Sequence, residues 1–129
     1  MNENTLAEIV IGIAIDVHRE LGPGLLESVY KECLFMALSK KGLQVRKEVP
    51  VAVHYDGVKL PCGYRLDLLI EERLVVEIKS VDQLNEIHMA QVLTYLKLGD
   101  FRLGLLMNFN SLRLKHGCRR LINGQILEG

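Results

Sequence analysis

Residues 65–79 read RLDLLIEERLVVEIK, in which two apolar runs lie on either side of the charged triplet 71–73. Short apolar runs joined by a few polar residues are typical of two antiparallel strands and their turn. Counting outward from the triplet places Asp67 opposite Glu77. Lys79 follows two residues later and therefore shares the face of Glu77. We expect this hairpin to bring two carboxylates and one ammonium group together.

Carboxylates that face one another across two strands repel, so the expected pair needs a nearby cation. Oxygen ligands at this spacing suit Mg²⁺ or Mn²⁺. The alternative is that Asp67 and Glu77 face solvent on a polar sheet surface and that Lys79 forms a salt bridge there. The flanking residues weaken that alternative, because a charged side chain is costly in an apolar strand unless it is paired or metal-bound. These neighbours are Leu66, Leu68, Leu69, Ile70, Leu74, Val75, Val76 and Ile78.

Two helices are expected before this hairpin. Residues 6–21 place apolar side chains at steps of three and four, which is the pattern of an amphipathic helix, and Asn4 or Thr5 is its expected cap. The Gly-Pro-Gly cluster at 22–24 then breaks the helix. The same spacing resumes from about 25 to 41 and predicts a second helix.

The period changes to two residues after the second helix. Residues 45–55 alternate, with Val45, Val49, Val51, Val53 and Tyr55 on one face of a half-buried strand. Asp56-Gly57 is a strong signal for a tight hairpin turn, so a second strand should return from Val58, with a bend at Gly63.

The remaining segments complete an α/β order. Residues 84–98 have helical spacing and predict a third helix. Residues 101–109 are apolar enough for a central strand, and the helix is the crossover that connects it to the preceding strands. Residues 112–115 and 118–122 are expected to form a terminal hairpin. The predicted order is ααβββαβββ, a mixed sheet flanked by helices, in a single domain that spans residues 1–129.

Composition narrows the class of protein. The chain has 129 residues, of which 49% are hydrophobic, and its 16 basic residues balance its 16 acidic ones. These values fit one globular domain. With zero net charge, the molecule lacks the strong positive field of a protein that coats duplex nucleic acid. The basic residues nevertheless dominate one segment, 101–122, which holds five cations and no acid. That segment is either a local contact for a phosphate backbone or a solvated hairpin. Its cations are Arg102, Arg113, Lys115, Arg119 and Arg120.

No apolar run is long enough to span a bilayer, and the first residues are polar and acidic, unlike a signal peptide. We therefore expect a cytoplasmic protein without membrane contact. The cysteines are odd in number and lack the CxxC spacing of a zinc site, so we interpret them as small hydrophobic residues. They are Cys33, Cys62 and Cys118.

The motifs resemble those of a known group. Asp67, followed after nine residues by Glu-Ile-Lys at 77–79 and then by a helix with Gln91 and Tyr95, resembles the PD-(D/E)XK nuclease superfamily in its RecB-like form with a QxxxY helix. Residues 24–30, GLLESVY, are similar to the GxxExxY signature of a family of small bacterial and archaeal proteins in that superfamily. Two further segments, 65–68 and 106–109, resemble the same family. One departure is Leu66, where the superfamily has proline.

The resemblance implies a restriction-endonuclease-like fold and a metal site. It implies that Asp67, Glu77 and the main-chain carbonyl of Ile78 hold a divalent ion, and that Lys79 orients and helps to deprotonate a water molecule. Glu27 is implied as a further acid, either bound to the ion through water or holding a second one. The alternative for Glu27 is a favourable interaction with the helix dipole, because acids are common in a first helical turn.

Gln91 and Tyr95 lie four residues apart on one helical face, and His88 lies about one turn earlier. Their polar groups are suited to donate hydrogen bonds to a phosphate. The alternative is that they link the helix to the sheet, with Tyr95 buried.

The resulting hypothesis is a Mg²⁺- or Mn²⁺-dependent nuclease, a phosphodiesterase acting on nucleic acid, with DNA favoured over RNA. The competing hypothesis is a catalytically silent nuclease-fold module that binds nucleic acid or protein. A homodimer is also expected, because two sites related by a two-fold axis can act on both strands of a duplex.

Overall fold

The computed structural model describes residues 1–128, apart from the side chain of Cys62. The described chain forms one sheet with the order β1-β2-β3-β4-β5, in which only β3 and β4 are parallel. This confirms the predicted α/β class with a mixed sheet. The elements are α1 (Glu3–Leu21), α2 (Glu27–Lys40), β1 (Val45–Tyr55), β2 (Val58–Ile70), β3 (Leu74–Lys79), α3 (Glu86–Gly99), β4 (Leu103–Asn108), the 3₁₀ turn η1 (Leu114–Gly117) and β5 (Cys118–Ile122).

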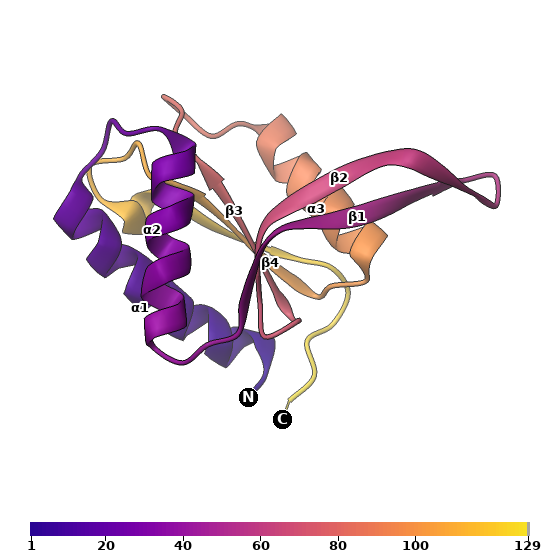
Figure 1. The fold of residues 1–129 in the computed structure, drawn as a ribbon, viewed down its shortest axis with the longest axis horizontal. Helices are drawn as coiled ribbons and strands as arrows, with labels where there is room; N and C mark the ends of the chain where they lie inside the picture. Colours follow the sequence, from indigo (N-terminus) through magenta and orange to yellow (C-terminus); the bar gives the residue numbers. More distant parts are fainter. Residues whose placement is uncertain (129) are drawn as a thin grey trace.

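Helices cover both faces of the sheet (Figure 1). The larger core lies between the sheet and the pair α1 and α2, and it includes Ile78. The smaller core lies between α3 and the other face and includes Val75. Gly104 lets α3 approach β4 closely, since a Cβ there would lie 2.9 Å from Val92 Cγ1. The parallel pair β3 and β4 is therefore covered on both faces, as parallel strands require.

The helix boundaries differ slightly from the prediction. The cap of α1 is Asn2 rather than Asn4 or Thr5, because Asn2 Oδ1 accepts from the Thr5 N–H at 3.0 Å. Helix α2 begins at Glu27, two residues later than expected. Helix α3 ends at Gly99 and is closed by Asp100, whose φ of 57° is left-handed.

The predicted strand at 112–115 is wrong, and the sheet of the described residues has five strands. Residues 114–117 instead form one 3₁₀ turn that buries Leu114. Gly117 lies so close to the preceding segment that a Cβ would be 2.6 Å from the Asn108 carbonyl oxygen. This tight return places Cys118 directly opposite Met107, so β5 pairs with β4 without an intervening strand.

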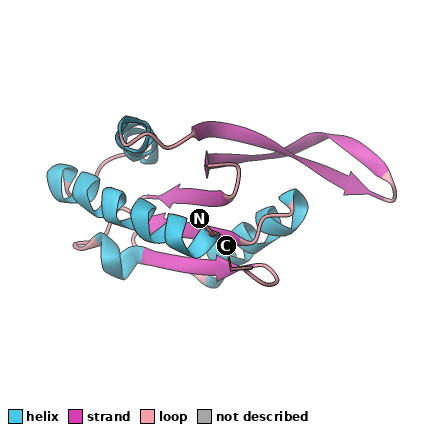
Figure 2. Ribbon diagram, turned by 90° about the horizontal axis from the view of Figure 1, so that it is seen from below, coloured by secondary structure: helices cyan, strands magenta, loops and turns pink. Residues whose placement is uncertain are grey.

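The β1–β2 hairpin is long, turns at Asp56-Gly57 as predicted, and extends away from the body in both views (Figures 1 and 2). Its valines were predicted to share one face. They contact two different cores: Val45 packs on the larger core, whereas Val49 belongs to the smaller one. The change occurs at Glu48, whose φ of 55° is left-handed. Its two neighbours, Lys47 and Val49, pair with Leu68 and Leu66, which flank Asp67.

No helix within residues 1–128 has both the length and the apolar character needed to cross a membrane.

Candidate active site

Asp67 and Glu77 lie where the ladder between β2 and β3 ends. The turn pairs Ile70 with Leu74 as predicted, and the last regular pair is Leu68 with Val76. Beyond it, side chains take over the hydrogen bonding. Asp67 Oδ2 accepts from the Ile78 N–H at 2.8 Å, and Glu77 Oε1 accepts from the Asp67 N–H at 3.4 Å. The two carboxyl groups therefore meet across the strands, as the spacing predicts.

Glu77 is 5% exposed, and its environment disfavours the charged form. Burial raises the pKa of the Glu77 carboxyl to about 9, and the charge of Asp67 and a side-chain hydrogen bond to it act in the same direction. The Asp67 N–H and the Lys79 ammonium group oppose this increase. At neutral pH Glu77 therefore holds a proton, because carboxyl groups this close cannot both ionise without a further cation.

Lys79 is half-buried and ends β3. Its main-chain oxygen accepts from the Phe109 N–H at 2.9 Å. The next loop is held by Asn108, whose side chain accepts from Val81 N at 3.1 Å and donates to Val81 O at 2.9 Å. These bonds fix the backbone around the acid pair through β4.

A second lysine, which the sequence did not single out, lies beside the pair. Lys31 of α2 donates to Glu48 Oε1 at 2.9 Å. This hydrogen bond raises the pKa of the Lys31 ammonium group, to which the charge of Asp67 also contributes. The only local signal for Lys31 is its position one helical turn after Glu27, and the left-handed turn at Glu48 has no sequence signal.

Tyr95 of α3 lies near the acid pair. Burial raises the pKa of the Tyr95 hydroxyl, with further contributions from Glu77, Tyr64 and Asp67. The centroids of the Tyr64 and Tyr95 rings lie 4.8 Å apart, so the middle of the β1–β2 hairpin contributes an aromatic group that the sequence reasoning missed. Gln91 is exposed on the same helix. His88 forms a capping box with Asn85 and thereby helps to begin α3.

Glu27 is the first residue of α2 and is exposed. The segment before it is held by buried Tyr30, whose hydroxyl donates to Gly22 O at 2.6 Å and accepts from Leu25 N at 3.0 Å. Ser80 Oγ donates to Leu25 O at 2.6 Å and joins this segment to the end of β3. The Gly, Glu and Tyr of the 24–30 motif thus occupy one structural unit at the start of α2.

The donor set fits a small divalent cation. Mg²⁺ commonly uses one or two carboxylates and retains water molecules, and a cation would relieve the crowding of Asp67 and Glu77. Within residues 1–128, no three His, Cys, Asp or Glu residues gather as a metal-binding cluster. The structure thus brings together Asp67, Glu77 and Lys79, with Tyr95 near them, but does not join Glu27 to the pair.

Comparisons with known proteins agree with this geometry. No curated protein matches the chain significantly, and neither does any solved structure. The sequence model of one family, described as the PD-(D/E)XK nuclease superfamily, matches residues 4–121. This range contains the acid pair, Lys79 and all five strands except the last residue of β5. With its restriction-endonuclease-like α/β fold, the chain belongs to the PD-(D/E)XK nuclease superfamily.

Proposed function

We propose that the protein is a Mg²⁺- or Mn²⁺-dependent nuclease that hydrolyses phosphodiester bonds of nucleic acid, DNA in preference to RNA. The observation that supports this most is the pairing of Asp67 with the buried Glu77 beside Lys79 in a member of a nuclease superfamily. We also propose the finer assignment to the GxxExxY family and the RecB-like branch, on the motifs at 24–30 and 91–95.

Asp67, Glu77 and the Ile78 carbonyl would hold the ion, and Glu27 would bind it through water or hold a second ion. When bound, such an ion lowers the pKa of a water molecule and neutralises charge on a phosphoryl oxygen. The low exposure of Glu77 keeps its carboxyl group away from bulk water, which strengthens the interaction of that group with a cation.

The remaining side chains act on water and substrate. Lys79 orients the attacking water and assists its deprotonation, since it lies two residues after Glu77 on β3. Tyr95 and Gln91 on α3 donate hydrogen bonds to the phosphate that flanks the scissile bond. Lys31 balances the charge of Glu48 and Asp67, so that the start of α2 stays close to the site.

The test is to incubate the pure protein with linear, circular and single-stranded DNA and with RNA, in Mn²⁺ or in EDTA. We expect cleavage that requires Mn²⁺ and is lost in Lys79→Ala. Lys97→Ala is the matched control, because Lys97 is exposed in the last turn of α3. Absence of metal-dependent cleavage of every substrate, or equal cleavage by Lys79→Ala, would contradict the proposed activity.

The second candidate is a catalytically silent module that keeps one ion for stability. It is favoured by the separation of Glu27 from the acid pair and by the zero net charge of the chain. A rise in melting temperature on adding Mn²⁺, together with salt-dependent DNA binding and no hydrolysis, would support it.

We propose a two-fold homodimer as the active form, since two sites would then face the two strands of a duplex. Light scattering at micromolar concentration, with and without DNA, is expected to give twice the mass of one chain. A monomeric mass under both conditions would contradict the dimer and leave the assignment of the acid pair unaffected.

A further inference from the structure

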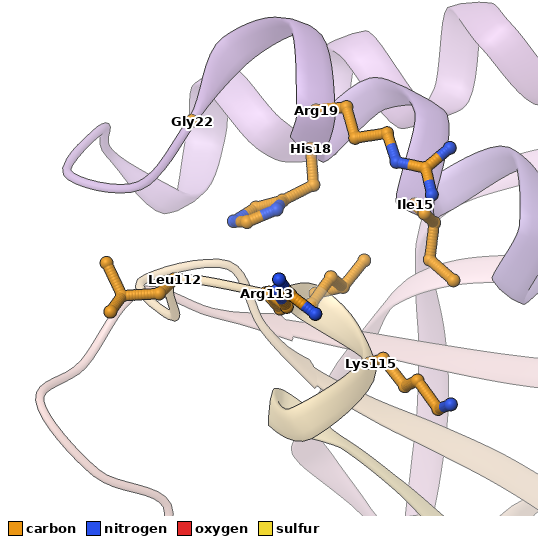
Figure 3. Close-up of a pocket in the computed structure, with 8 residues that line it drawn as sticks. Ile15, His18, Arg19, Gly22, Leu112, Arg113 and Lys115 are labelled. Carbon is orange, nitrogen blue, oxygen red and sulfur yellow. The ribbon is translucent and has the colours of Figure 1, made fainter.

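A cavity lies between α1 and the segment that carries η1 (Figure 3). Its volume is about 590 Å³, within the range of cavities that hold small ligands. It lies on the α1 side of the sheet, whereas Tyr95 on α3 contributes to the acid pair's site from the other side. The lining residues are Ile15, His18, Arg19, Gly22, Leu112, Arg113, Leu114 and Lys115.

His18 is the buried polar group of this cavity, with 5% exposure. Its Nε2 lies 3.1 Å from the Phe109 carbonyl oxygen, and a carbonyl oxygen only accepts hydrogen bonds. Nε2 therefore carries the proton, and Nδ1 is left for another partner. Within residues 1–128 no hydrogen bond involves Nδ1, and Figure 3 shows the ring directed from α1 into the space above Arg113. The proposed reaction at Asp67 and Glu77 does not use this histidine.

The charges around the cavity are of one sign. Arg19, Arg113 and Lys115 line it, and none of the lining residues is acidic. Arg19 has a solvent-exposed contact with Asp16 at 3.7 Å, which is weak because water screens it. Within the described residues, no ion pair involves Arg113 or Lys115. An anion in the cavity would therefore meet cations that protein carboxylates do not neutralise.

We propose that this cavity binds the phosphate group of a nucleotide. Arg113 would bind the phosphate through its guanidinium group, which is suited to two parallel hydrogen bonds. His18 would contact the same group as an imidazolium, in which Nε2 still donates to Phe109 O and Nδ1 donates to a phosphate oxygen. Arg19 and Lys115 add positive charge at the mouth. Ile15 and the 91% exposed Leu112 provide apolar surface for the attached nucleoside.

A free nucleotide and the phosphorylated end of a nucleic-acid strand both present this chemistry. The site does not depend on the proposed nuclease activity, because none of its residues belongs to the metal centre. It is nevertheless connected to that centre through one residue: the Phe109 carbonyl accepts from His18, and the Phe109 N–H donates to the Lys79 carbonyl. An occupant of the cavity would thus stabilise the backbone that carries Lys79.

The experiment titrates the metal-free protein with AMP in EDTA, and separately with matched 5′-phosphorylated and unphosphorylated oligonucleotides. NMR of the histidine imidazoles follows His18, and calorimetry gives the affinity. We expect a change at the His18 Nδ1 resonance that saturates with AMP and a loss of affinity of about tenfold in Arg113→Gln, the effect of removing one charge-assisted contact. If the phosphorylated oligonucleotide binds more tightly than AMP, the bound phosphate comes from the end of a strand. If AMP binds more tightly, the ligand is a free nucleotide.

Lys97→Gln is the matched control, since it removes an exposed cation outside the cavity. Asp67→Asn should leave AMP binding unchanged, which separates this proposal from the nuclease assignment. No change at His18, equal affinity in Arg113→Gln, or equal binding of sulfate and AMP would each overturn the nucleotide site, whether or not the protein cleaves DNA.

Discussion

Glu77 makes the stability of the metal-free protein depend on pH. Its pKa is about 9 in the folded state against an ordinary value of 4.5, so the folded protein holds this proton more tightly than the unfolded chain does. The associated stability is fully present below pH 4.5 and is lost as the pH rises toward 9. The slope is at most about 1.4 kcal/mol per pH unit for one proton. We expect Glu77→Gln to remove this slope in urea unfolding at pH 5–9, whereas Glu8→Gln, at an exposed position, keeps it. A slope that persists in Glu77→Gln would place the titrating group elsewhere.

Asp67→Asn separates metal binding from folding. Asparagine retains an oxygen that accepts from the Ile78 N–H, and it removes the Asp67 charge that disfavours the ionised form of Glu77. The metal-free variant should therefore be as stable as the parent near neutral pH and more stable toward pH 9. Its response to Mn²⁺ should disappear in calorimetry. In the parent protein the affinity for Mn²⁺ should rise by up to about tenfold per pH unit below pH 9, because binding displaces the Glu77 proton. Asp16→Asn is the control, since its carboxyl is exposed. A clearly destabilised Asp67→Asn with no ion in the parent would instead assign Asp67 a structural role.

Local spacing predicted part of this site. Asp67, Glu77 and Lys79 belong to one hairpin whose turn has three residues, so counting along the sequence was enough to place them together. Lys31 and Tyr64 were missed, because Lys31 approaches Asp67 only when α2 packs on the sheet and Tyr64 meets Tyr95 only when the β1–β2 hairpin packs against α3. Tertiary contacts of this kind leave no periodic pattern in the sequence.

At the scale of elements, Tyr30 fixes the start of α2. Its buried hydroxyl binds Gly22 O and Leu25 N, and its ring stacks on Phe109 with 4.6 Å between centroids. Tyr30→Phe leaves two main-chain groups without this partner and should lower the free energy of unfolding by about 1–3 kcal/mol. Tyr55→Phe should have no effect, because Tyr55 is 75% exposed. Denaturant unfolding compares the two variants, and equal stability would show that solvent replaces the hydroxyl.

Element boundaries show where pattern reasoning fails. The helices and β1 to β4 follow from periodicity, with shifts of a few residues at their ends. The segment 112–115 alternates like a strand, but the closeness of Gly117 to Asn108 compresses it into a 3₁₀ turn. The path of this segment is fixed by the pairing of β5 with β4, a contact that local residues do not encode.

At the scale of the molecule, the neutral charge limits how nucleic acid binds. Acidic and basic residues number 16 each, and the exposed cations after α3 are confined to residues 102–120. We expect about three phosphate contacts, and hence a slope near −3 for the logarithm of the DNA binding constant against that of salt concentration. Fluorescence anisotropy in EDTA measures it. A slope steeper than about −7 or close to zero would contradict a local phosphate contact.

The short turn between β2 and β3 has a consequence for the order in which the chain folds. The turn spans 71–73, whereas the parallel pairing of β3 with β4 requires residues 80–102 to cross over first. Closing the shorter loop costs less entropy, so we expect the hairpin to form early, with its carboxyl groups still hydrated. These carboxyl groups then lose water only late in folding, when α3 and β4 dock on the hairpin. Raising the pH from 6 to 9 should therefore accelerate unfolding and leave the refolding rate almost unchanged in stopped-flow kinetics.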